Sequence, residues 1–168
     1  MRPLSFVGSG FWGKQSDMPL FAPPSIEGMR ILADGRDGLE GRGLLLISAL
    51  HLAARNLQGV EIRVLGGQDV VIEVAIEALR WDTGLSIGLV PPDADLRTEL
   101  AGARLFVAVA ARKTDHLPLA EVAAAGVSSL VPVQFPPAGA GASALALMRA
   151  AHDPRELARQ ILDRLESS

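Results

Sequence analysis

The chain alternates between short apolar runs, which are typical of buried strands, and longer segments whose apolar residues recur at helical spacing. The predicted strands cover residues 29–34, 60–67, 84–90, 104–111 and 128–133. The predicted helices cover residues 42–56, 70–81, 93–103, 117–125, 143–151 and 153–165. Strand and helix alternate with short connections, which predicts an α/β fold: a Rossmann-like, doubly wound parallel sheet with helices on both faces.

Several helix starts carry capping signals. Asp93 is the expected N-cap of the helix that begins there, and Asp115 is the expected N-cap of the helix that follows it. At the last helix, Asp153 precedes Pro154, and Glu156 completes a variant of the capping box.

Residues 1–28 carry prolines and glycines and no sustained helical or strand period, so we predict an extended lead-in. Its apolar residues Phe6, Phe11, Trp12 and Phe21 indicate that it packs on the domain or on a part of the protein missing here. Residues 29–168 then form the folded domain.

Composition narrows the function. The 168 residues are 49% hydrophobic with a net charge of −3, which supplies a core and gives no basic surface for nucleic acid or anionic membranes. The absence of cysteine excludes disulfides, thiol catalysis and zinc–thiolate sites, and the three histidines match no metal-ligand spacing. We therefore expect no metal and no cofactor. With neither a signal-peptide pattern nor a transmembrane segment, we expect a cytoplasmic location.

Ligands of such sheets bind beyond the carboxyl ends of the strands, where the strand order reverses. The first loop there opens with Gly35 and Arg36 and ends at Arg42, just before a helix. Glycine amides, a helix N-terminus and two arginines could hold a diphosphate. A flexible turn with solvated arginines is the alternative.

A second loop at this edge reads KTDH and leads into a helix with Glu121. The Glu121 carboxylate could accept two ribose hydroxyls, or simply favour the positive end of its helix. Lys113 could bind phosphate or point into solvent, and His116 could donate to a sugar hydroxyl or cap the helix. Asp82, Asp93 and Asp95 are interpreted as turn and cap residues.

From about residue 17 to residue 164, the chain resembles the C-terminal, nucleotide-sugar-binding domain of the retaining GT-B glycosyltransferases of the large family-four group (glycosyl transferases group 1). Similar stretches occur in the family's order: DMPLFAPP with MRILADGR, the Arg42-Gly43 pair before LLLISAL, VEIRVLGG, LSIGLVPPDADLRTELAGARLFVAV, LPLAEVAAAGVSSLVPV and DPRELARQILDRL. The resemblance implies one half of a GT-B fold.

The resemblance also implies roles for individual residues. Arg36 and Arg42, with Gly35 in the same loop, would hold the donor diphosphate, and Glu121 would bind the ribose of a UDP-, GDP- or ADP-sugar. Eight positions before Glu121, where the family usually has a second glutamate that contacts the donor sugar, this chain has Lys113. The family's small Gly-rich stretch is Thr114-Asp115-His116 here. A reversed charge beside a developing positive centre is unfavourable for the usual mechanism, so the catalytic residue is unknown.

Two hypotheses follow. In the first, the chain is a glycosyltransferase C-terminal domain that binds the nucleoside diphosphate of a donor and needs an N-terminal acceptor domain or partner chain, so it would be inactive alone. In the second, it is a degenerate, non-catalytic Rossmann-like domain used for interaction or homo-oligomerisation. A receiver-like signalling domain needs a cluster of acidic residues at the end of the first strand and an aspartate at the end of the third. It is disfavoured, because Asp34 alone fits the first requirement and Leu89-Val90 stand at the second place.

Overall fold

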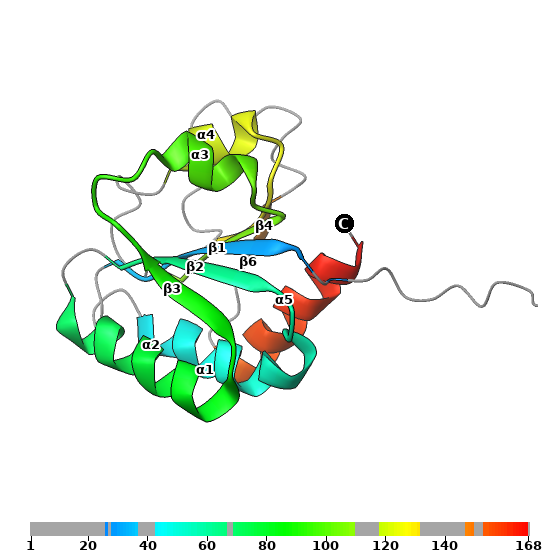
Figure 1. Cartoon of the computed structure of the whole chain (residues 1–168). Helices are drawn as coiled ribbons and strands as arrows, with labels where there is room; N and C mark the ends of the chain where they lie inside the picture. Colours follow the sequence, from blue (N-terminus) through cyan, green and yellow to red (C-terminus); the bar gives the residue numbers. More distant parts are fainter. Residues whose placement is uncertain are drawn as a thin grey trace, which may run out of the picture.

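The computed structural model describes residues 26, 28–36, 43–66, 69–109, 118–131, 147–149 and 153–167. Within these ranges the chain forms a six-stranded parallel sheet with the strand order β3-β2-β1-β4-β5-β6. Helices α1, α2 and α5 cover one face of the sheet, and α3 and α4 cover the other (Figure 1). The predicted doubly wound α/β fold is therefore confirmed.

The element bounds agree closely with the hydrophobic pattern. The strands are β1 Arg30–Asp34, β2 Glu61–Leu65, β3 Ser86–Val90, β4 Leu105–Ala108, β5 Ser128–Val131 and β6 Leu147–Arg149. The helices are α1 Gly43–Ala53 with the short 3-10 turn Ala54–Asn56, α2 Val70–Thr83, α3 Leu96–Ala101, α4 Leu119–Ala124 and α5 Pro154–Ser167.

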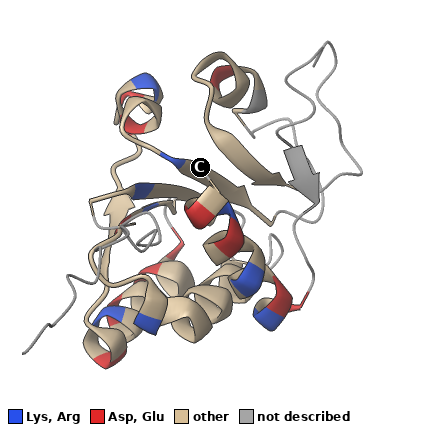
Figure 2. Ribbon diagram, turned by 90° about the vertical axis from the view of Figure 1, so that its right-hand side faces the viewer, with Lys and Arg blue, Asp and Glu red and all other residues tan. Residues whose placement is uncertain are grey.

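Two apolar clusters fill the space between the layers, because successive strand residues point to opposite faces of a sheet. In β1, Ile31 and Ala33 join the larger cluster under α1, α2 and α5, whereas Leu32 joins the smaller one under α3 and α4. Phe106 of β4 is fully buried in that smaller cluster. Most charged residues lie on the helices (Figure 2), and strands β3, β4 and β5 carry none.

The strand order places a switch point at the centre of the sheet. The chain runs outward from β1 to β2 and β3, then returns so that β4 pairs with the other side of β1. The carboxyl ends of β1 and β4 therefore define the crevice in which ligands of such sheets bind.

One predicted helix is wrong. Residues 143–151 were expected to be helical, but Leu147–Arg149 form β6, which pairs in parallel with β5 from Leu147 opposite Ser129 to Arg149 opposite Val131. Leucine and methionine are good helix formers, but pairing with the open edge of β5 outweighs that local preference.

One capping prediction is confirmed and another is wrong. Asp153 caps α5 as expected, since its carboxylate accepts the backbone N–H groups of Arg155 and Glu156 at 2.9 and 3.0 Å. Asp93 does not cap α3. Asp95 does, accepting the Arg97 N–H at 3.1 Å and the Thr98 hydroxyl at 3.0 Å. The helix starts later than the pattern indicated because residues 92–94 turn first.

The free edge of the sheet at β3 is covered by an arginine. Arg80 of α2 donates from Nε and Nη2 to the backbone oxygen of Ile87, at 3.1 and 2.6 Å. An edge strand exposes backbone groups that pair readily with other chains, and a charged side chain on such a group blocks that pairing.

Arg80→Ala is expected to lower the free energy of unfolding by about 1.5 kcal/mol, because two charge-assisted hydrogen bonds are lost. It should also increase concentration-dependent aggregation, measured by light scattering during thermal unfolding. Arg159→Ala on α5, another exposed helix arginine paired with a neighbouring glutamate, is the matched control. Equal scattering from both variants would contradict the edge-protection role.

Candidate functional site

At the switch point, a buried carboxylate holds Arg36. Asp34, the last residue of β1, has a side chain only 2% exposed. It accepts from Arg36 Nε at 3.0 and 3.2 Å, from Arg36 Nη2 at 2.6 Å, and from the Arg36 backbone N–H at 3.0 Å. The forked guanidinium is thus fixed in orientation, while a third of the Arg36 side chain stays exposed.

Gly35 lets this turn pass close to β2. Its N–H donates to the Leu65 oxygen at 2.9 Å, and a Cβ at this position would lie 3.0 Å from Cγ1 of Val64. The backbone between Asp34 and Arg36 is therefore pressed against the sheet edge, which brings Arg36 to the mouth of a cavity.

That cavity has a volume of about 250 Å³ and lies over the carboxyl ends of β2 and β3. The cavity is mostly apolar. Among the described residues, Arg36 is the one charged residue that lines it. The uncharged lining residues are Leu65, Gly66, Val90, Pro91, Pro92, Ala94 and Leu96. An apolar cavity beside an oriented guanidinium suits a ligand with an apolar or aromatic part and an anionic part.

Glu121 lies in a different hollow. It is exposed on the first turn of α4 and lines a hollow of about 590 Å³ between α3 and α4. Arg97, Leu100 and Ala101 of α3 form the opposite wall. The two hollows share α3 as a boundary, since Leu96 borders the smaller one and Arg97 the larger.

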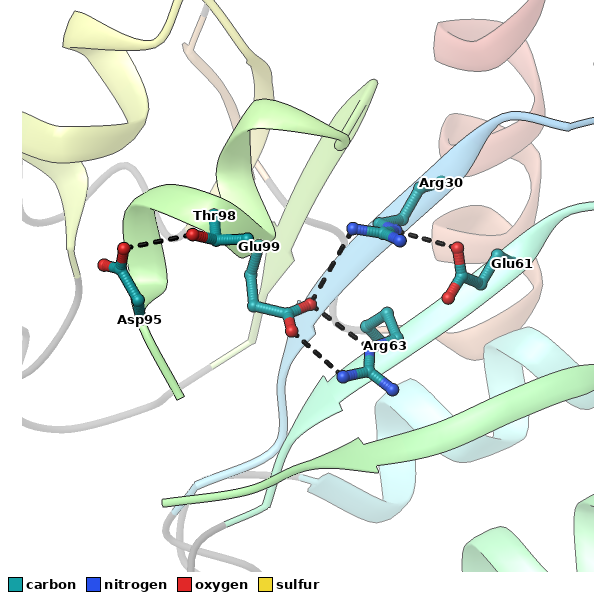
Figure 3. Close-up of polar contacts among 6 residues, drawn as sticks. All are labelled: Arg30, Glu61, Arg63, Asp95, Thr98 and Glu99. Carbon is teal, nitrogen blue, oxygen red and sulfur yellow. Dashed lines mark hydrogen bonds and ion pairs between the residues drawn. The ribbon is translucent and has the colours of Figure 1, made fainter. Parts of the chain in front are cut away.

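A half-buried charge network fixes α3 in place (Figure 3). Glu99 of α3 accepts from Arg63 of β2 at 2.9 and 3.2 Å and lies 4.0 Å from Arg30 of β1. Arg30 also donates to Glu61 at 2.8 Å. The shared wall of both hollows is thereby tied to strands β1 and β2.

This network shifts the ionisation of its members. The hydrogen bond from Arg63 lowers the pKa of Glu99 below its ordinary value, with the charges of Arg63 and Arg30 acting in the same direction and burial opposing them. The same hydrogen bond raises the pKa of Arg63. Glu99 is therefore ionised at neutral pH.

The structure separates the sequence-predicted site residues into three groups. Gly35 and Arg36 lie together at the switch point, and Glu121 lies in the hollow between α3 and α4. Arg42, Lys113 and His116, and the predicted cap Asp115, lie outside the described residues. Of the acidic residues interpreted as turn and cap residues, Asp95 caps α3 and Asp82 lies 3.1 Å from His51.

Sequence reasoning missed Asp34 as a site residue. The signal was present, because an aspartate at the end of an otherwise apolar strand, two residues before an arginine, is an unusual burial. The cavity wall at Pro91 and Leu96 carried no such signal, since its place depends on where α3 packs.

In the described ranges, histidine and acidic side chains do not gather in groups of three that would hold a metal ion. None of the helices described has the length and apolar character that crossing a lipid bilayer requires.

No protein-family model matches the chain, and no curated protein matches it. Among solved structures, WaaG, a glycosyltransferase involved in lipopolysaccharide biosynthesis, matches with a TM-score of 0.65 and 22% identity over 83% of this chain and 38% of WaaG. The C-terminal domain of a glycosyl transferase group 1 family protein (LpcC) from Francisella tularensis matches with a TM-score of 0.60 and 17% identity, over 84% of this chain and 76% of that domain. The catalytic domain of cholesterol-α-glucosyltransferase from Helicobacter pylori matches with a TM-score of 0.62 and 20% identity, over 83% of this chain and 87% of that domain.

The fold of the chain is thus that of one GT-B half-domain, as the sequence resemblance implied. The chain spans well under half of the WaaG chain but most of the two single-domain structures.

Proposed function

We propose that this chain is the donor-binding half of a glycosyltransferase and binds the nucleoside diphosphate of a nucleotide sugar. The observation that carries the proposal is Arg36, oriented by buried Asp34 at the switch point of a GT-B fold and beside an apolar cavity. A guanidinium in this position can donate two parallel hydrogen bonds to a diphosphate.

The remaining donor-binding roles follow the family resemblance. Gly35 keeps the loop close to the sheet, and Arg42 supplies a second cation for the diphosphate. Glu121 accepts the ribose hydroxyls, which its exposure in the hollow between α3 and α4 permits. His116 and Lys113 contribute further donors to the sugar or phosphate. The nucleoside diphosphate that these residues bind is UDP, GDP or ADP.

Catalysis would need a second component. Transfer between a donor and an acceptor needs both in one cleft, and the chain spans only 38% of WaaG. We infer that an N-terminal acceptor domain or a partner chain completes the site. Without that component the chain is inactive alone in this proposal, and Lys113 in place of the family's glutamate leaves the catalytic residue unknown.

Isothermal titration of the purified chain with UDP, GDP and ADP tests the proposal. One nucleotide should bind saturably, and Glu121→Gln should weaken it about tenfold, since hydrogen bonds to a charged acceptor are worth about 1.5 kcal/mol. Glu73→Gln, which changes an exposed glutamate on the opposite face of the sheet, is the matched control and should leave the affinity unchanged.

Either of two results would count against the proposal. Equal affinity in both variants would remove Glu121 from the site. No heat with any of the three nucleotides would favour the degenerate, non-catalytic interaction domain instead.

A further inference from the structure

Helix α2 is apolar on two opposite faces. Ile72, Ile76 and Leu79 are buried against the sheet. Val70, Val74 and Trp81 are 66%, 63% and 88% exposed. Because each residue advances about 100° around a helix, positions 70, 74 and 81 fall in one narrow stripe, directly opposite the buried face. We call these three residues the outer stripe.

Such a stripe is unusual for a surface helix, whose outward face is normally polar. Trp81 alone leaves on the order of 200 Å² of side chain in water, and the two valines lie on the same line. Scattered exposed apolar residues are ordinary, but an aligned set on one helix indicates a surface that something covers.

We propose that the outer stripe is covered by the chain's own segment 6–21. This segment contains Phe6, Phe11, Trp12 and Phe21, which are four of the seven aromatic residues in the sequence. Apart from Trp81 itself, the described residues hold a single aromatic side chain, Phe106, and that side chain is buried. The segment is thus rich in the side chains that an exposed Val-Val-Trp stripe would pack against.

The start of the described chain lies beside the C-terminal end of α2, the end that carries Trp81. The Gly28 N–H donates to the Gly59 oxygen at 2.9 Å, and the adjacent Gln58 side chain lies 3.3 Å from the Thr83 oxygen at the end of α2. Trp81 is two residues before Thr83.

The segment is also long enough to follow the helix. The five residues from Phe21 to Ile26, which packs against the larger apolar cluster, span up to about 17 Å when extended. Helix α2 is about 21 Å long. Phe21 can therefore reach the Trp81 end of the outer stripe, and the residues before it can run along the helix.

The sequence itself supplies the reporter. With Trp12→Phe, Trp81 becomes the single tryptophan of the full-length chain. We expect blue-shifted Trp81 emission and weak quenching by acrylamide, despite its exposure on α2. Adding Phe6→Ser, Phe11→Ser and Phe21→Ser together should shift the emission to the red and raise the quenching constant severalfold. The same three positions changed to leucine should preserve the protection.

Phe135→Ser, outside both the segment and α2, is the matched control, and circular dichroism checks that each variant is folded. Strong quenching of Trp81 in the Trp12→Phe chain would overturn the proposal. So would protection that survives the serine substitutions and rises with protein concentration, because a second copy would then cover the stripe.

A crosslink gives an independent test that does not depend on those variants. The chain has no cysteine, so Ser9→Cys with Val74→Cys places one thiol on the segment and one on the outer stripe. Mild oxidation should yield an intramolecular disulfide, whereas Ser9→Cys with Ala124→Cys on the opposite layer should not. Equal yields from the two pairs would overturn the proposal.

Discussion

Arg36→Ala is expected to destabilise the domain by about 3 kcal/mol, because it leaves a buried carboxylate without its cation. Asp34 is 3% exposed, and the guanidinium supplies three of its four hydrogen bonds. Only the Arg36 backbone N–H would remain as a donor. Chemical denaturation of the wild type and the variant at pH 7 measures the difference.

The double variant Asp34→Asn with Arg36→Ala is the control. It removes the charge together with its partner, so it should recover about half of the lost stability, since a neutral amide is much less costly to bury than a carboxylate. If Arg36→Ala were as stable as the wild type, the pair would not hold the turn. Because it is more stable than Arg36→Ala, the double variant also allows the nucleotide affinity to be measured on a folded chain that lacks the guanidinium.

Glu99→Gln is expected to lower the free energy of unfolding at pH 7 by about 2 kcal/mol, because Arg63 and Arg30 would face a neutral amide. The side chain of Glu99 is 11% exposed and those of the two arginines are 27% exposed. Solvent therefore screens the network only in part, and the loss exceeds that of a surface ion pair.

The effect should depend on pH in a defined direction. The pKa of Glu99 is lowered in the folded state from the ordinary value of 4.5, so its contribution is fully present above pH 4.5 and is lost as the pH falls through the lower, folded-state pKa. The stability difference between wild type and Glu99→Gln should thus be constant from pH 7 to about pH 5 and shrink below pH 4.5.

Glu156→Gln supplies the comparison. The pKa of Glu156 is also lowered, chiefly by a hydrogen bond from Arg159, but that pair is exposed on α5. Water screens an exposed pair, so this variant should change stability little at any pH. A pH-independent loss in Glu99→Gln would show that packing, and not ionisation, is what the substitution removes.

Much of the fold was predictable because it rests on local patterns. The five predicted strands were located from short apolar or alternating runs. Glu61–Leu65 alternates, whereas Leu105–Ala108 is apolar throughout because it is covered on both faces. The cap at Asp153 was predictable because capping is local: its carboxylate accepts from backbone groups only two and three residues away. The failure at Leu147–Arg149 has the opposite cause, since those residues take their conformation from β5.

The candidate site residues came from local patterns. Arg36 and Glu121 are predicted because glycine-arginine turns and the glutamate helix form recognisable patterns. Their placement in separate hollows that both border α3 could not be predicted, because it depends on how that helix packs. The nucleotide-binding roles of both residues stay predictions.

By itself, the sequence determined the α/β class, the succession of elements and the loops that carry polar residues, because these depend on hydrophobic period and on neighbours a few residues apart. Only the tertiary structure decided which strands adjoin, that Glu99 joins Arg63 across 36 positions, and that α2 turns a second apolar face away from the sheet. These features depend on contacts between residues far apart in the chain, and a periodic pattern does not record which distant partner closes such a contact.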